Sequence, residues 1–258
     1  MKYVIANWKM NLSVRESIAL TRGVLRAVQG KESLPCLVVC PSLTSLAEVH
    51  KLITRTHVAL GAQTVGPERS GAFTGEVGTA QLEDVGCTYV LIGHSERRRL
   101  FGETDDLVRQ RVTAVLGSKL TPVVCVGEPA DVRRTGKAES YVLNQLKAAF
   151  LDQKLSRQQK LIVAYEPVWA IGTGEAATPE QVVAMHATIR HFLVRNLGFS
   201  TDTVQVVYGG SVNGENAYQF LREQEVDGVL VGGASLKVTE FTKIFAAAWE
   251  VMEAQDSV

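Results

Sequence analysis

The sequence predicts an α/β protein that folds as one (β/α)8 barrel domain over residues 1–258. Eight short apolar runs recur along the chain, and segments long enough to form helices separate them. Runs that are apolar almost throughout are typical of strands buried on both faces of a parallel sheet, and parallel strands need long crossover connections. An open, doubly wound sheet shows the same alternation, but eight units in about 250 residues favour the barrel.

The predicted strands cover residues 4–6, 37–40, 58–60, 89–92, 122–126, 161–165, 204–208 and 228–231. The clearest helix lies between the sixth and seventh strands, over residues 179–197. Thr178 and Gln181 form a capping box around Pro179, apolar residues then recur at helical spacing, and Gly198 ends the helix. Two connections, residues 63–79 and 167–178, are long and contain glycine, which is typical of functional loops in compact domains.

The composition argues against several classes of protein. The 27 Lys and Arg residues balance the 27 Asp and Glu residues, whereas non-specific binding to nucleic acid or a membrane surface needs a strongly basic face. The N-terminus has no signal-peptide pattern, and no apolar run approaches the ~20 residues that span a bilayer. The four cysteines contain no C-x-x-C pair. We therefore expect reduced thiols and a cytoplasmic enzyme.

Residues with acid–base side chains follow three of the predicted strands. Lys9 lies just beyond the first strand, His94 beyond the fourth and Glu166 beyond the sixth. Taken singly, such residues are more often surface charges or structural residues. Because barrel enzymes place their active sites at the C-terminal ends of the strands, the three side chains are expected to converge. A carboxylate beside an imidazole suits removal of a proton next to a carbonyl group.

Glycine pairs follow the last two predicted strands: Gly209 and Gly210 precede Ser211, and Gly232 precedes Gly233. Barrels commonly bind phosphate at these two strands, since glycine lets backbone N–H groups approach an anion and a helix N-terminus adds positive charge. The sequence has no metal-ligand spacing and no dinucleotide fingerprint after the first strand. We therefore expect a phosphorylated substrate, and neither a metal ion nor a cofactor.

Six segments resemble signature segments of the triosephosphate isomerase family, in the order that the family has them. They are NWKMN at 7–11, GAFTGE at 71–76, IGHSERR at 92–98, AYEPVWAIGTG at 164–174, YGGSV at 208–212 and VGGAS at 231–235. The resemblance covers the whole chain. It implies a TIM barrel that interconverts dihydroxyacetone phosphate and D-glyceraldehyde 3-phosphate through an enediol(ate), in glycolysis and gluconeogenesis.

The resemblance also implies roles for individual residues. Glu166 matches the general base, and His94 matches an electrophile that polarises the carbonyl; this family is itself a standard example of a histidine kept neutral by a helix N-terminus. Lys9 matches the active-site ammonium group, and Asn7 matches the neighbour that places the substrate oxygens. The residues that match phosphate-contacting backbone amides are Gly172, Ser211, Gly232 and Gly233.

Further expectations from the resemblance concern a lid and a dimer. Residues 167–174 resemble the hinged lid of the family, again a standard example of its kind, whose closure excludes water. Ser95 resembles the hydroxyl group that holds the glutamate while the site is open, and Glu96 a carboxylate near the lysine. The loop around Phe73 and Thr74 resembles one that inserts into a neighbouring subunit and braces its active-site lysine. We therefore expect a homodimer.

Three positions depart from the family pattern. Ala6 stands where glycine is common and should matter little. Thr64 stands where Asn or Asp is frequent, so a contact near the interface should differ. Glu175 stands where a lysine often closes the lid, which should change the electrostatics of the hinge. Cys125, at the end of the fifth strand, is expected to be structural.

Two other functions share part of this pattern. Another phosphate-binding barrel enzyme, such as an isomerase or lyase of tryptophan or histidine biosynthesis, would have the glycine pairs but lack the combination of Lys9, His94 and Glu166. A non-catalytic barrel that serves as a scaffold would lose the base, the electrophile or the lid, and none of these is lost.

Overall fold

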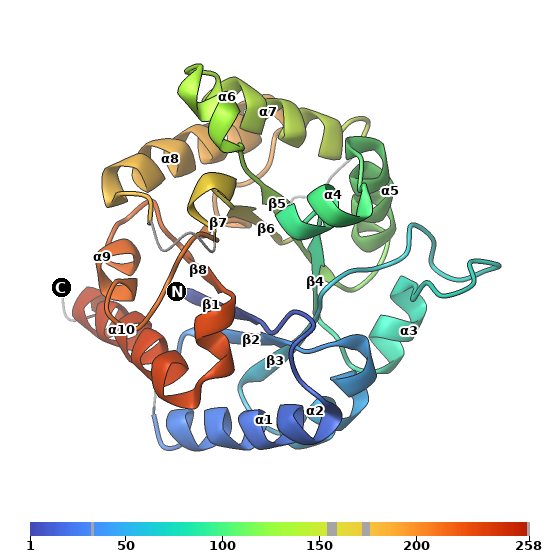
Figure 1. The fold of residues 1–258 in the computed structure, drawn as a ribbon, viewed down its shortest axis with the longest axis vertical. Helices are drawn as coiled ribbons and strands as arrows, with labels where there is room; N and C mark the ends of the chain where they lie inside the picture. Colours follow the sequence, from blue (N-terminus) through green and yellow to red (C-terminus); the bar gives the residue numbers. More distant parts are fainter. Residues whose placement is uncertain (32–33, 154–158, 172–175, 257–258) are drawn as a thin grey trace.

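The computed structural model, which describes residues 1–31, 34–153, 159–171 and 176–256, is a closed barrel of eight parallel strands in sequence order. Figure 1 looks along the barrel, with the helices in a ring outside the strands. The strands are β1 Tyr3–Asn7, β2 Cys36–Cys40, β3 Val58–Ala62, β4 Tyr89–Ile92, β5 Thr121–Val126, β6 Leu161–Tyr165, β7 Val204–Tyr208 and β8 Gly228–Val231. The predicted (β/α)8 fold is therefore confirmed.

The helices lie between the strands and after the last one. The α-helices are α1 Val14–Val28, α2 Leu46–Ile53, α3 Thr79–Asp84, α4 Ser95–Phe101, α5 Asp105–Leu116, α6 Ala130–Arg134, α7 Ala138–Ala149, α8 Pro179–Asn196, α9 Ala217–Leu221 and α10 Val238–Asp256. Short 3-10 helices are η1 Leu43–Ser45, η2 Val168–Ala170 and η3 Gly233–Leu236. Within the described part of the chain, no helix is both long enough and apolar enough to cross a membrane.

Alternate residues of each strand face two different cores. β1 pairs with β2 and with β8, which closes the barrel, and Ile5 lies opposite Val38 on one side and Leu230 on the other. These inward-facing residues form a small core inside the barrel, while the outward-facing ones pack against the helices in a larger core. Inside the barrel, a Cβ at Gly61 would lie 2.5 Å from Cys40 Sγ. The missing side chain at Gly61 thus leaves the space that the cysteine fills.

Helix α8 forms as its sequence predicts. The Thr178 side chain accepts a hydrogen bond from the backbone of Gln181, whose side chain in turn accepts one from the Thr178 backbone, and Pro179 begins the helix. Gly198, just beyond the end, has a φ of 73°, a conformation that disfavours any residue with a Cβ. The apolar residues at helical spacing are all buried: Val182, Met185, Ile189, Phe192 and Leu193.

His186 lies on the buried face of α8, where its Nδ1 is 3.1 Å from the carbonyl oxygen of Glu225. Burial lowers the pKa of this imidazole to about 3. In the unfolded chain a histidine has a pKa near 6.5, so below that pH the unfolded state binds a proton that the folded state does not. The free energy of unfolding should therefore fall as the pH drops from 6.5 towards 3, by about 2 kcal/mol between pH 6.5 and 5.

Urea unfolding at pH 7, 6 and 5 tests this prediction, with His186→Gln as the comparison. Glutamine does not titrate, so the variant should lose less stability on acidification than the parent chain, even if it is less stable at pH 7. Equal losses in the two proteins would show that His186 does not set the acid sensitivity.

Candidate active site

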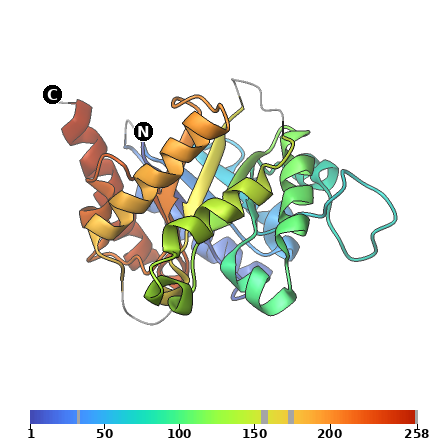
Figure 2. The same cartoon turned by 90° about the horizontal axis from the view of Figure 1, so that it is seen from above.

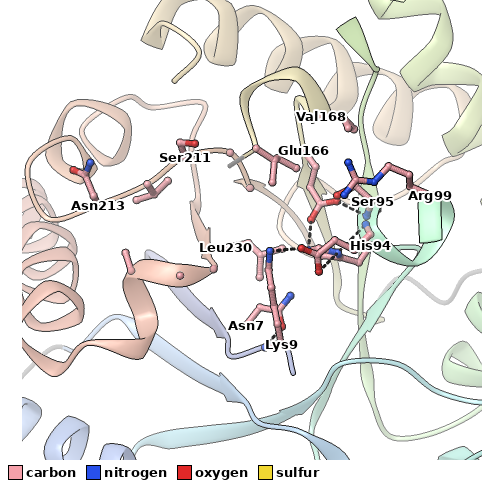
Figure 3. Close-up of a pocket in the computed structure, with 18 residues that line it drawn as sticks. Asn7, Lys9, His94, Ser95, Arg99, Glu166, Val168, Ser211, Asn213 and Leu230 are labelled. Carbon is pink, nitrogen blue, oxygen red and sulfur yellow. Dashed lines mark hydrogen bonds and ion pairs between the residues drawn. The ribbon is translucent and has the colours of Figure 1, made fainter. Parts of the chain in front are cut away.

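A pocket of about 560 Å³ opens at the C-terminal end of the barrel. The pocket gathers residues from the loops after β1, β4, β6, β7 and β8 (Figure 3). Seven of the eight predicted site residues line it: Asn7, Lys9, His94, Glu166, Ser211, Gly232 and Gly233. The eighth, Gly172, lies outside the described residues. The expected convergence of residues far apart in the sequence is thus present in the fold.

Lys9 reaches the pocket from a tight turn after β1. Its backbone has a φ of 53°, which is uncommon for a residue other than glycine. Two side chains hold the turn: Asn7 Oδ1 accepts a hydrogen bond from the Lys9 N–H at 3.1 Å, and Gln63 Nε2 donates to the Lys9 carbonyl oxygen at 2.9 Å. Lys9 Nζ lies 2.6 Å from Glu96 Oε1, so the expected proximity of Glu96 to the lysine is observed.

His94 lies two residues beyond β4 and caps α4, which begins at Ser95. Its Nδ1 accepts a hydrogen bond of 3.2 Å from the backbone N–H of Glu96. A nitrogen that accepts carries no proton, so the imidazole in this arrangement is neutral and its proton lies on Nε2. Nε2 lies 3.1 Å from Glu166 Oε1. The ring therefore offers a neutral N–H donor to the pocket.

Glu166 follows β6, and its carboxylate is almost completely buried. Oε2 accepts a hydrogen bond of 2.8 Å from the backbone N–H of Ser95. Oε1, although close to His94, has no hydrogen-bond partner of suitable geometry within the described residues. Gly209 makes room for this side chain, since a Cβ there would lie 2.9 Å from Glu166 Cγ. Ser95 thus contacts the carboxylate, but through its backbone and not through the hydroxyl group that we expected.

The opposite side of the pocket is built from backbone. Ser211 follows β7, Gly232 lies between β8 and η3, and Gly233 begins η3. Within the described residues, none of the backbone N–H groups of these three donates to another backbone group. A Cβ at Gly233 would meet nothing within 4 Å. Free N–H groups beside a helix start suit an anion such as phosphate.

Hydrogen bonds hold the described residues on both sides of the expected lid tip. Trp169 Nε1 donates a hydrogen bond of 2.8 Å to the buried carboxylate of Glu128, which also accepts one from the Tyr165 hydroxyl group. Beyond the segment, the Ala177 N–H donates to the Tyr208 hydroxyl group at 3.3 Å. Residues 172–175, which include most of the expected lid tip and Glu175, lie outside the described residues.

Two further expectations concern residues near the site. Thr64 Oγ1 accepts a hydrogen bond of 3.3 Å from Arg111, whose guanidinium group also binds Glu103. Thr64 therefore joins a buried ion pair at the base of the loop that carries Phe73. Cys125 is fully buried, and burial together with the charge of Glu166 raises its pKa well above the usual range. A thiol held in the protonated form is inert, which agrees with a structural role.

Sequence reasoning assigned no role to some residues that line the pocket, among them Arg99, Asn213 and Leu230. For two of them a signal existed. Arg99 lies four residues after Ser95 on a helix that starts at the site, which places it on the same face. Leu230 lies two residues before Gly232 on β8, and strand alternation directs it into the barrel. Among the described residues, no group of three or more His, Cys, Asp or Glu side chains is arranged to hold a metal ion.

Comparison with known proteins agrees with this geometry. The family model described as triosephosphate isomerase matches residues 2–248. Proteins named triosephosphate isomerase from Endomicrobium trichonymphae, a Roseiflexus species (strain RS-1) and Chloroflexus aurantiacus are 43%, 45% and 45% identical to the chain. These alignments cover 92–93% of the chain and 94–96% of each relative. The chain belongs to the triosephosphate isomerase family.

Proposed function

We propose that the chain interconverts D-glyceraldehyde 3-phosphate and dihydroxyacetone phosphate, with Glu166 as the base. One observation carries the proposal: a buried carboxylate, a neutral imidazole N–H and an ammonium group line one pocket. Its other side presents backbone N–H groups that donate to no other backbone group in the described part of the chain. The phosphate of a triose phosphate would bind those N–H groups at Ser211, Gly232 and Gly233, and Gly172 is proposed to add a fourth. The carbonyl end would then lie among Glu166, His94 and Lys9.

In the first step Glu166 removes the proton from C2 of the aldehyde. The electron pair of that C–H bond forms a C1–C2 double bond, and negative charge develops on O1. The His94 Nε2–H and the Lys9 ammonium group stabilise this charge, as pre-placed donors do in a site that excludes water. Asn7 holds the turn that places Lys9 and is proposed to contact the substrate oxygens.

In the second step a proton moves between the two oxygens through His94, and Glu166 returns its proton to C1. The product is the ketone, the glutamate is ionised again, and no electrons leave the substrate. The resting contact between Glu166 and the Ser95 N–H is one that the carboxylate must leave to reach carbon. Closure of the segment 167–174 over the phosphate would supply the dry surroundings that strengthen these interactions.

A coupled assay of purified protein with D-glyceraldehyde 3-phosphate, in the presence of EDTA and without added cofactor, tests the proposal. Rapid formation of dihydroxyacetone phosphate is the expected result. A folded protein that binds phosphate but forms no ketone would leave the alternative of another phosphate-binding barrel enzyme or a scaffold.

We further propose that the active unit is a homodimer. The loop between β3 and α3 projects from the barrel (Figure 2). It contains Phe73, which is 46% exposed, and Thr74, which is also exposed. Met10, Leu100 and Phe101 are also large apolar side chains with more than half of their surface exposed. Exposed apolar side chains of this size favour a partner surface.

The four free thiols support a reducing compartment such as the cytoplasm.

Thr74→Arg is expected to convert the dimer to a monomer, because a charge buried at an interface without a partner costs several kcal/mol. Sedimentation velocity measures the change, with Thr135→Arg, at an exposed position just beyond α6, as the control. A parent chain that sediments as a monomer at micromolar concentration would contradict the dimer.

A further inference from the structure

Arg99 is a cation at the pocket that neither the reaction steps nor the phosphate contacts use. It lies on α4, one helical turn after Ser95, and lines the pocket with Lys9. Figure 3 shows its side chain reaching from α4 towards the side of the pocket that holds Glu166. It also lines a neighbouring pocket of about 270 Å³, which shares Ser95, Glu166 and Val168 with the first. The guanidinium group thus stands at the entrance beside the proposed base.

Within the described part of the chain, no acidic side chain pairs with Arg99. The two arginines before it on α4 have acidic partners: Arg97 pairs with Glu103, and Arg98 pairs with Asp105. Arg99 is exposed, and its side chain forms no hydrogen bond or ion pair with any residue in the described ranges. Its charge is therefore available to a ligand that approaches from solvent.

The balance of charge in the pocket shows what this cation can do. Two cations, Lys9 and Arg99, and two carboxylates, Glu96 and Glu166, line the pocket. Lys9 is paired with Glu96 at 2.6 Å, which leaves Glu166 facing an incoming phosphate dianion. The whole chain has a formal net charge of zero, so it provides no long-range attraction. Among the described residues that line the pocket, Arg99 is the one cation without an acidic partner, and its charge offsets the repulsion from Glu166.

We propose that Arg99 draws the phosphorylated substrate into the pocket and offsets the repulsion between Glu166 and the phosphate. The inference rests on the proposed function, since it presumes a triose phosphate as substrate. Charges that line a cleft raise association rates by roughly 10- to 1,000-fold, and salt screens them. Arg99 therefore acts on kcat/KM through substrate association and leaves the proton-transfer steps unchanged.

The test measures kcat/KM of Arg99→Ala for D-glyceraldehyde 3-phosphate at two ionic strengths. At an ionic strength of about 0.01 M the Debye length is ~30 Å, and kcat/KM of the variant should be three- to tenfold lower than that of the parent chain. Near 1 M the Debye length is ~3 Å, and the kcat/KM values of the two proteins should converge. The kcat should change less than twofold at both. Arg99→Lys, which keeps the charge, should retain most of the low-salt kcat/KM.

Arg55→Ala is the matched control. Arg55 is exposed and lies between α2 and β3, at the end of the barrel opposite the pocket, and its removal changes the net charge of the chain equally. Equal kcat/KM for the two alanine variants at low salt would overturn the proposal, as would a loss that persists near 1 M salt. A parent chain without activity would instead overturn the proposed function.

Discussion

Glu166→Gln is expected to lower kcat by about 10³- to 10⁴-fold, at the upper end of what a positioned general base contributes. The amide has nearly the same shape but cannot take a proton from carbon. Its oxygen can still accept the hydrogen bond from the Ser95 N–H that holds the carboxylate in the resting site. The fold and the affinity for inorganic phosphate should therefore change little.

Glu166→Asp separates position from chemistry. The shorter side chain keeps an ionised base but withdraws it by roughly 1 Å or more, and a misplacement of that size costs about 100-fold. Steady-state kinetics of both variants, with circular dichroism to verify folding, would measure the two losses. A Gln variant within tenfold of the parent would exclude Glu166 as the base and point to another carboxylate.

His94→Gln is expected to lower kcat and kcat/KM together by about 10²- to 10³-fold, the cost of removing one pre-placed donor to a developing oxyanion. In the structure the Glu96 N–H fixes the neutral tautomer and aims Nε2–H into the pocket. Glutamine has an N–H donor, but nothing holds it in this orientation. It also cannot relay a proton between the substrate oxygens as readily as an imidazole.

His57→Gln provides the control, because His57 is an exposed histidine that directly precedes β3 at the opposite end of the barrel. It should leave kcat and KM unchanged. A His94→Gln variant that raises KM alone would mean that His94 binds ground state and transition state equally, which would contradict its role as the electrophile.

Much of the fold was accessible from local sequence pattern. The strands are apolar almost throughout, and the observed ones differ from the predicted ranges by at most two residues at an end. Most of the added end residues have polar or small side chains, such as Asn7 and Ala62. The capping residues of α8 predicted its start because a cap acts within one turn of helix.

The site was predictable as far as its residues follow strands. Once a barrel is inferred, the end of each strand has a known place, so Lys9, His94 and Glu166 could be brought together without coordinates. The contact of Glu166 with the Ser95 backbone was missed because it depends on how α4 is oriented against β6. That Arg99 has no acidic partner among the described residues was missed for a similar reason. Its neighbours Arg97 and Arg98 are also arginines, yet each pairs with an acidic side chain.

A carboxylate in this pocket is proposed to move a proton between adjacent carbons of the substrate. Isomerisation of D-glyceraldehyde 3-phosphate in D₂O, followed by ¹H NMR, tests it most directly, because a proton held by a carboxylate can exchange with solvent before it returns to carbon. The predicted result is that a substantial part of the dihydroxyacetone phosphate carries one deuterium at C1. The Glu166→Gln variant should not form this labelled product. Product that forms at the same rate but contains no deuterium at C1 would indicate direct hydride transfer and contradict the claim.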